Sequence, residues 1–162
     1  MISKDEWAVI IDDNYQDIYR FVSRLLGEFN EAQDVTQETF LYAYSNWPKI
    51  TDPLALRRWL FVTARNKCFD RFRLWRRMRE RIAECFMQSA KARSFGEEQT
   101  DIAQCLKKLP RRQKEVFVLR HWHGFTSAEV AMILGINEGS VKSHLFRAIR
   151  RMNELLGDKV IY

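Results

Sequence analysis

The sequence predicts an all-α protein with two small helical domains joined by a flexible linker, the second of which contains a helix-turn-helix. Three observations lead to this prediction. Apolar residues recur mainly at the 3.6-residue period of a helix, and few stretches show the apolar-polar alternation of a strand. Only three prolines and six glycines punctuate the 162 residues, of which 46% are hydrophobic. The periodicity weakens over residues 82–100 and then returns, so this stretch separates two cores.

The first long helix is predicted from a stripe of apolar residues that ends at Gly27. Successive members of the stripe lie three or four residues apart, which places them on one face of a helix. The stripe consists of Trp7, Ile11, Tyr15, Ile18, Val22 and Leu25.

A second helix, predicted over about 31–47, has two contrasting faces. The face expected to be buried carries Thr36, Phe40, Ala43 and Trp47. The other face has acids, an amide and one leucine at positions i, i+3, i+4 and i+7, namely Asp34, Gln37, Glu38 and Leu41. Such a stripe is typical of a solvated helix face, and its composition fits a docking surface for a basic helical partner equally well.

A third helix is strongly basic and follows a loop bracketed by Pro48 and Pro53. It is predicted from about 54 towards 81, with aromatic and arginine residues interleaved. Aromatic rings stack on unpaired bases and guanidinium groups bind phosphates, so the pattern favours a nucleic-acid surface, although some of the aromatic side chains must belong to the core. The apolar members are Trp59, Leu60, Phe61, Phe69, Phe72 and Trp75, and the cations are Arg57, Arg58, Arg65, Lys67, Arg71, Arg73, Arg76 and Arg77.

The second domain begins with a short helix predicted over 101–109. Pro110 opens the next helix at a position where the missing N–H of proline is harmless. Val116, Phe117 and Leu119 of that helix contribute to the second core.

The helix-turn-helix is predicted from capping signals over 126–152. Thr126 and Glu129 form a capping box at the start of the first helix. Gly135 suits the left-handed backbone at the turn, and Asn137 caps the second helix. The second helix buries Val141, Leu145, Ala148 and Met152 and turns Lys142, Ser143, Phe146, Arg147 and Arg150 outward. A basic outward face of this kind fits a DNA major groove, and a purely structural helical hairpin is the alternative.

The net charge of +6 is unevenly distributed. Residues 1–50 hold 4 basic and 9 acidic groups, whereas residues 51–93 hold 12 and 4 and residues 94–162 hold 11 and 8. A basic middle followed by a basic carboxyl-terminal region indicates a polyanionic partner. The acidic first segment is expected to face a different partner.

Several classes of protein are disfavoured by the sequence. No apolar run approaches the roughly 20 residues of a membrane span, and the amino terminus lacks the pattern of a secretory signal, so we expect a cytoplasmic protein without membrane insertion. Cys68, Cys85 and Cys105 lack disulfide or zinc-site spacing, and His121 and His123 lack a third ligand nearby. With no nucleophile-base motif or phosphate-binding glycine loop, we expect no catalysis, no metal and no cofactor.

Four segments together resemble successive signature regions of the extracytoplasmic-function (ECF) sigma factors, the smallest bacterial sigma subunits. The segments are AQDVTQETFLYAY, RRWLFVTARNKCFDRFR, LPRRQKEVFVLRHWHGFT and SAEVAMILGINEGSVKSHLFRA. The resemblance covers nearly the whole chain. It implies that residues 1–81 dock on core RNA polymerase and melt the minus-ten promoter element, that 82–100 form a linker, and that 101–162 read the minus-thirty-five element. It also suggests an anti-sigma protein as a regulatory partner.

The resemblance assigns roles to three groups of residues. The polymerase-docking face would comprise Asp34, Gln37, Glu38 and Leu41. The melted strand would be held by Lys49, Arg57, Trp59, Arg65 and Asn66, with Trp59 either stacking on DNA or packing in the core. The minus-thirty-five element would be contacted by Lys142, Ser143, Phe146 and Arg147.

Two other functions compete with this interpretation. An autonomous dimeric helix-turn-helix regulator would need a dimer interface and a palindromic site. An interaction protein could occupy a helical partner and use its basic middle for RNA or membrane. Co-elution with core polymerase, followed by transcription from a defined start, separates the three functions.

Overall fold

The computed structural model describes residues 3–47, 50, 52–85 and 101–157, and in these ranges the chain is all-α, as predicted. No helix in the described ranges is long and apolar enough to span a membrane. The helices are α1 (Lys4–Leu26), α2 (Phe29–Ser45), α3 (Pro53–Cys85), α4 (Asp101–Lys107), α5 (Arg111–His121), α6 (Ser127–Leu134) and α7 (Glu138–Leu156).

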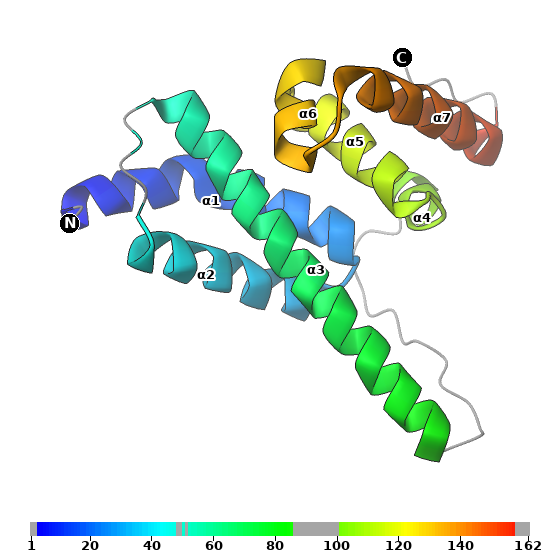
Figure 1. The fold of residues 1–162 in the computed structure, drawn as a ribbon, viewed down its shortest axis with the longest axis horizontal. Helices are drawn as coiled ribbons and strands as arrows, with labels where there is room; N and C mark the ends of the chain where they lie inside the picture. The colour runs from blue at the N-terminus through cyan, green and yellow to red at the C-terminus, as the bar shows by residue number, and fades with distance from the viewer. Residues whose placement is uncertain (1–2, 48–49, 51, 86–100, 158–162) are drawn as a thin grey trace.

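Helices α1, α2 and α3 pack together as an amino-terminal bundle, and the far end of α3 projects beyond it (Figure 1). A capping box starts α1, in which the Ser3 hydroxyl accepts from the Glu6 N–H and the Glu6 carboxylate accepts from the Ser3 N–H. The helix ends at Gly27, whose φ of 71° is a left-handed conformation that glycine adopts without strain. The predicted stripe is confirmed, with Ile18, Val22 and Leu25 buried in the core.

Helix α2 begins two residues before the predicted start and ends at Ser45. Its predicted inner face is buried at Thr36, Phe40 and Ala43. Trp47 lies after the helix and still packs inward, because its ring makes an edge contact with the Trp7 ring at 5.5 Å between centroids.

Helix α3 starts where the Asp52 carboxylate accepts hydrogen bonds from the backbone N–H groups of Leu54 and Ala55. It runs to Cys85, four residues past the predicted end, and so takes in the first part of the predicted linker. The rest of that linker, 86–100, lies outside the described residues, and the domain boundaries remain a prediction.

Helices α4 to α7 form the carboxyl-terminal bundle, in which α7 packs against α4, α5 and α6. The predicted helix-turn-helix is confirmed. Thr126 and Glu129 form the capping box of α6, Gly135 ends that helix with a φ of 64°, and the Asn137 side chain accepts from the Ser140 N–H at 2.7 Å. Helix α4 is shorter than predicted, ending at Lys107.

The two bundles are in direct contact, with α3 against α6 and α1 against α5 (Figure 1). Buried residues of both bundles belong to one continuous hydrophobic cluster. At the junction the Phe61 ring of α3 meets the Phe125 ring edge to face, with 4.9 Å between centroids. The arrangement is therefore closed, which the separation of the sequence into two domains did not predict.

Candidate nucleic-acid interface

The outward face of α7 is open, as the sequence predicts. Lys142, Ser143, Phe146 and Arg147 are all exposed, and Phe146 retains 69% of its accessible surface. The opposite side of the helix is buried at Val141, Ala148 and Met152. An apolar ring beside an ammonium, a hydroxyl and a guanidinium group supplies the contacts that base edges in a major groove accept.

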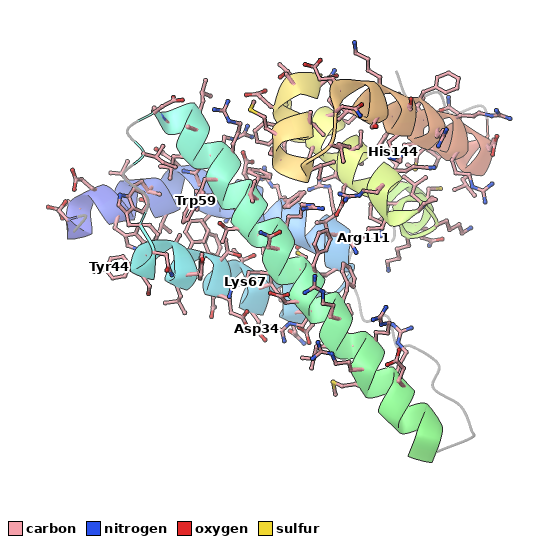
Figure 2. The ribbon with its side chains drawn as sticks, viewed as in Figure 1. Asp34, Tyr44, Trp59, Lys67, Arg111 and His144 are labelled. Atoms are coloured by element: carbon pink, nitrogen blue, oxygen red, sulfur yellow. The ribbon has the colours of Figure 1, made fainter. Side chains whose placement is uncertain are left out.

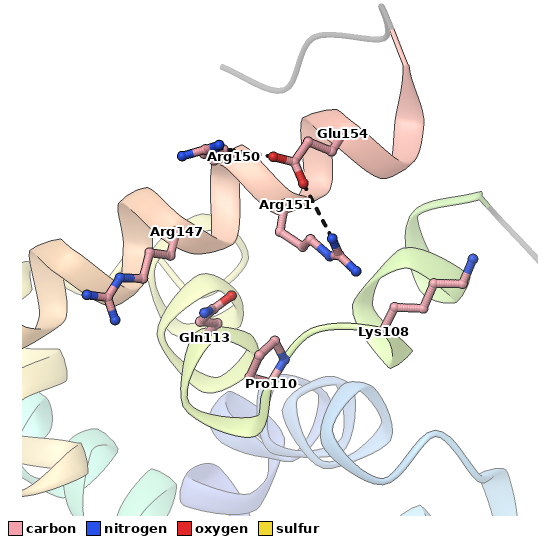
Figure 3. Close-up of a pocket in the computed structure, with 7 residues that line it drawn as sticks. All are labelled: Lys108, Pro110, Gln113, Arg147, Arg150, Arg151 and Glu154. Carbon is pink, nitrogen blue, oxygen red and sulfur yellow. Dashed lines mark hydrogen bonds and ion pairs between the residues drawn. The ribbon is translucent and has the colours of Figure 1, made fainter.

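A hollow of about 320 Å³ continues this basic surface at the carboxyl-terminal half of α7 (Figure 3). One acid, Glu154, pairs with Arg150 at 3.2 Å and with Arg151 at 3.4 Å. The side chains around the hollow, mostly basic, are Lys108, Pro110, Gln113, Arg147, Arg150, Arg151 and Glu154. Cations outnumber the single acid, so the hollow favours an anionic backbone such as that of DNA.

The acidic stripe of α2 is exposed along its whole length. Leu41 is 68% exposed, and Asp34, Gln37 and Glu38 are exposed beside it. The Glu38 carboxylate accepts a hydrogen bond of 2.9 Å from Arg71. An exposed leucine among acids suits a partner that combines an apolar contact with basic side chains.

The predicted strand-binding residues of α3 fall into different environments. Asn66 is exposed, and Trp59 is half-buried against the hydrophobic core. Figure 2 labels Trp59 on α3, within the amino-terminal bundle. Lys49 lies outside the described residues. In this structure Trp59 therefore packs partly against the core, Asn66 is accessible to a ligand, and the roles of both residues toward DNA remain predictions.

Arg57 faces the carboxyl-terminal bundle. Its guanidinium pairs with Asp17 of α1 at 3.1 Å and donates to the backbone carbonyl of His123, also at 3.1 Å. It also lies over the Phe125 ring, 4.3 Å from the centroid. A residue predicted to contact DNA thus holds the two bundles together in this structure.

Arg65 is similarly engaged and is only 8% exposed. Its Nε lies 3.4 Å from Glu115 of α5, which is fully buried and also pairs with Arg111 and Arg112. Burial lowers the pKa of Arg65, and the nearby Glu115 charge opposes that shift. The sequence placed Arg65 on a DNA surface but gave no sign of its acidic partner, which lies 50 residues away in the chain.

The aromatic side chains of α3 are used mainly for internal contacts. Phe61 is buried, and Phe72 meets Trp75 edge to face at 5.6 Å. The Phe69 ring lies beneath the guanidinium groups of Arg65 and Arg111, at 4.2 and 3.3 Å from the centroid. The interleaving of rings and arginines therefore builds cation–π contacts between the bundles in this state, rather than an open stacking surface.

Sequence reasoning missed His123, which it treated only as an unsuitable metal ligand. The residue follows α5 and is 6% exposed. Its ring makes edge contacts with Phe21 and Phe61 of the amino-terminal bundle, at 5.8 and 4.9 Å, and neither ring nitrogen forms a hydrogen bond within the described residues. Burial lowers its pKa to about 4, so the ring is neutral at pH 7.

The cysteine side chains offer no reactive site in the described residues. Cys68 and Cys105 are free and buried, and burial raises the pKa of the Cys68 thiol. Among the described side chains, no group of three histidine, cysteine or acidic residues is arranged to hold a metal ion.

Two family models match most of the chain and define its class. The model described as "Sigma-70 region 2" matches residues 10–78, and that described as "Sigma-70, region 4" matches residues 99–152. These matches cover the amino-terminal bundle and the helix-turn-helix bundle respectively. The chain is thus built from two promoter-recognition modules of the sigma-70 class.

Proteins of similar sequence identify the family within the sigma-70 class to which the chain belongs. The chain is 31% identical over 150 residues to the ECF RNA polymerase sigma factor SigL of Mycobacterium tuberculosis, covering 88% of this chain and 84% of that protein. It is 28% identical over 142 residues to the RNA polymerase sigma factor SigV of Bacillus subtilis, covering 88% and 86%. The chain belongs to the ECF family of RNA polymerase sigma factors.

Solved structures agree with this assignment. The sigma factor RpoE from Bartonella quintana, determined in complex with the anti-sigma factor NepR, matches with a TM-score of 0.77 and 25% identity over 96% of this chain and 97% of RpoE. The fold is also shared with CnrH, determined in complex with the cytosolic domain of CnrY, at a TM-score of 0.70 and 24% identity over 97% and 91% of the two chains.

Proposed function

We propose that this sigma factor works through three surfaces, which dock it on core polymerase, open the minus-ten element and read the minus-thirty-five element. The observation that carries the proposal is the open basic face of α7 on a capped helix-turn-helix, with Lys142, Ser143, Phe146 and Arg147 all accessible. Core polymerase would catalyse RNA synthesis, and this chain would direct it to the promoter. Because polymerase is the partner, the chain would act in the cytoplasm.

Polymerase docking is proposed for the exposed α2 stripe. The carboxylates of Asp34 and Glu38 would face basic groups of the partner, and Leu41 would bury its exposed side chain. Gln37 lies between them on the same face and adds a polar contact.

Strand opening is proposed for the loop before α3 and for the first turns of that helix. Extruding a base costs a few kcal/mol, which a fitted pocket and phosphate contacts must offset. Asn66 would hydrogen-bond a flipped base, and Arg57 and Arg65 would hold phosphates of the separated strand. Lys49 would add charge at the loop. Trp59 would support this surface from its packed position.

Regulation by an anti-sigma protein is also proposed. RpoE, which shares the fold of nearly the whole chain at 25% identity, is bound by such a protein. The α2 stripe would be one surface for it to cover, because it is exposed and would no longer be available to polymerase.

Reconstituted transcription tests the proposed function. Core polymerase with this chain should initiate at one defined start on a promoter template, whereas core alone should not. A variant with Lys142→Ala and Arg147→Ala should lose that start and still co-elute with polymerase. Failure to co-elute with polymerase, together with dimeric binding to a palindromic site, would instead establish the autonomous regulator, which the sigma-factor relatives do not favour.

A further inference from the structure

A basic hollow of about 320 Å³ lies between the carboxyl-terminal half of α7 and the turn that leads from α4 into α5 (Figure 3). All four of its cations are exposed, and one carboxylate stands among them. A ligand can therefore reach these cations from solvent. The cations are Lys108 of the turn and Arg147, Arg150 and Arg151 of α7, and the acid is Glu154.

The basic hollow continues the face of α7 that is proposed to read base edges. Arg147 belongs to both, and Arg150 follows it by three residues, so the two side chains lie on one side of the helix. Lys142 and Arg150 are separated by about 12 Å along the helix axis, which matches the width of a major groove. A helix that reads bases with its amino-terminal part therefore meets the phosphates of the bounding strand near Arg150.

Helix α5 begins at the other side of the basic hollow. Its first residue follows Pro110, and both Pro110 and Gln113 line the space. No described side chain caps this end of α5, so its first backbone N–H groups have no side-chain acceptor. The partial positive charge of a helix amino terminus therefore adds to the charge of the surrounding side chains.

Glu154 neutralises part of the basic hollow but holds its cations only weakly. Its carboxylate oxygens lie 3.2 Å from Nε of Arg150 and 3.4 Å from Nη1 of Arg151. The Glu154 side chain is 48% exposed, and an exposed ion pair contributes little free energy. A phosphate can therefore replace Glu154 as the acceptor of Arg150.

The lining of the basic hollow favours DNA over an acidic segment of a protein. A protein partner gains affinity mainly by burying apolar surface in the centre of an interface. Pro110 is the only apolar residue among the seven described residues that line the space. A nucleic-acid backbone needs no such surface, because cations alone supply most of its binding free energy.

We propose that the basic hollow binds backbone phosphates of duplex DNA beside the base pairs that α7 reads, with Arg150 and Lys108 as the main donors and Glu154 as an acid that limits the affinity. The proposal rests on the proposed reading of the minus-thirty-five element by α7. Phosphate contacts fix the register of a recognition helix on the duplex and carry no sequence information themselves. The basic hollow thus sets affinity and position, whereas Lys142 and Arg147 set sequence preference.

Binding of the full-length chain to a random-sequence duplex of about 20 base pairs, measured at several salt concentrations, tests the proposal. Each phosphate contact contributes about 0.9 to the slope of log affinity against log salt concentration, so one lost contact weakens binding roughly tenfold at about 50 mM salt. Arg150→Ala and Lys108→Ala should each lose this much slope and affinity. Glu154→Gln should bind at least about threefold more tightly than the wild-type chain, because it removes a negative charge beside the phosphate.

Helix α3 offers a matched pair of control variants. Arg76 and Glu80 are four residues apart and exposed, as Arg150 and Glu154 are, and the Arg76 Nε lies 3.6 Å from the Glu80 carboxylate. Arg76→Ala and Glu80→Gln therefore make the same changes of net charge away from the basic hollow. Both should keep the wild-type salt slope and change the affinity by less than about twofold, because salt screens distant charges.

Three outcomes would overturn the proposal. The first is wild-type slope and affinity in both Arg150→Ala and Lys108→Ala. The second is a loss in Arg76→Ala as large as that in Arg150→Ala, which would show a general effect of charge. The third is an unchanged salt slope together with lost binding of poly(glutamate) in Arg150→Ala and Lys108→Ala, which would assign the basic hollow to an acidic protein partner.

This experiment is independent of the proposed function in its outcome. The duplex carries no promoter element, and no polymerase is present. Failure of promoter-specific transcription in the reconstituted system would therefore reject the proposed function and leave the phosphate contacts of the basic hollow in place.

Discussion

The α7 face and the α3 face both offer arginines to nucleic acid, but only the first is open in the free chain. Arg147 is exposed on α7, whereas Arg65 on α3 is 8% exposed and paired with Glu115. The difference suggests that the α7 face binds DNA before the α3 face does. If the proposed roles hold, upstream recognition would need no rearrangement of this chain, whereas access of DNA to Arg57 and Arg65 would need the two bundles to separate first.

The acids that neutralise the two faces differ in the same way. Glu154 on α7 pairs with two arginines and is 48% exposed, whereas Glu115 on α5 pairs with three and is fully buried. An exposed ion pair contributes little to stability because water and salt screen it, whereas removing one member of a buried pair leaves an uncompensated charge. Replacing each of these two acids in turn therefore compares the covered face of α3 with the open face of α7 most directly.

Replacement of Glu115 by alanine should have the largest effect. This change removes the buried acceptor that Arg65, Arg111 and Arg112 share, so the free energy of unfolding should fall by about 3 kcal/mol. The matched Glu154→Ala change should cost less than about 1 kcal/mol. Urea unfolding followed by circular dichroism compares the two variants, and equal losses would contradict the contrast between a covered and an open face.

Replacement of Arg147 by alanine tests the open face. The change should weaken binding of holoenzyme to upstream promoter DNA by roughly 1 to 3 kcal/mol if a base edge is read bidentately, and by less if only a phosphate is touched. Lys142→Ala should act in the same direction. Titrations against matched and scrambled upstream sequences distinguish base reading from phosphate contact. Wild-type discrimination in both variants would remove the α7 face from promoter reading.

Replacement of Asn66 by alanine tests the other face without disturbing the interface between the bundles, because Asn66 is exposed. Holoenzyme with Asn66→Ala should form the closed promoter complex normally and open it roughly tenfold less, since a contact that offsets base extrusion is lost. A template with a pre-melted bubble should restore transcription. Permanganate reactivity of promoter thymines measures opening, and wild-type reactivity would show that Asn66 has no part in it.

The fold could be predicted from the sequence where the signals were local. Capping at Thr126 and Asn137, the turn at Gly135 and the stripes of α1 and α7 each depend on residues within a few positions of one another. The exposed faces of α2 and α7 followed from the same periodicity. Local chemistry thus determined the elements and most of the outward surfaces.

The covered state of α3 could not be predicted, because it depends on pairs far apart in sequence. Arg57 and His123 are 66 residues apart, and periodicity describes only the helix that carries each residue. A pattern of arginines and rings is equally compatible with DNA and with a cation–π contact inside the protein. Within RRQKE the sequence shows Glu115 only as one acid among cations, and its burial against Arg65 appears only in the structure.

Mild acid should open the covered face through His123. Asp17, Arg20, Arg24 and Arg57 are the charged groups around its ring, whose pKa is lowered from 6.5 to about 4, chiefly by burial. The open state takes up a proton below about pH 6.5 and the closed state does not until about pH 4, so closure weakens as the pH falls through this window. At pH 5.5 the closed arrangement should lose on the order of 1 kcal/mol of stability.

Small-angle X-ray scattering measured between pH 7.5 and 5 should therefore show the radius of gyration rising as the pH falls. A His123→Gln variant, which cannot titrate at this position, should lose most of the rise. A His144→Gln variant serves as the control because His144 lies on α7, away from the contact between the bundles (Figure 2). An identical rise in all three proteins would assign the pH response to groups other than His123.

Charge reversal at Asp34 should have the smallest effect on stability and should separate docking from both nucleic-acid faces. The side chain is exposed on α2 and forms no ion pair with the described residues, so Asp34→Lys should change the free energy of unfolding by less than about 0.5 kcal/mol. Affinity for core polymerase should nevertheless fall, because a lysine would now face a basic partner.

Glu38 is a less suitable position for this test, since its reversal also removes the acceptor of Arg71. Oligo(dT) binding by the free chain should stay near the wild-type level, because Asp34 forms no ion pair with the described residues of α3 or of the carboxyl-terminal bundle. Sedimentation with core polymerase measures the loss, and undiminished affinity of the Asp34→Lys chain would show that polymerase binds elsewhere.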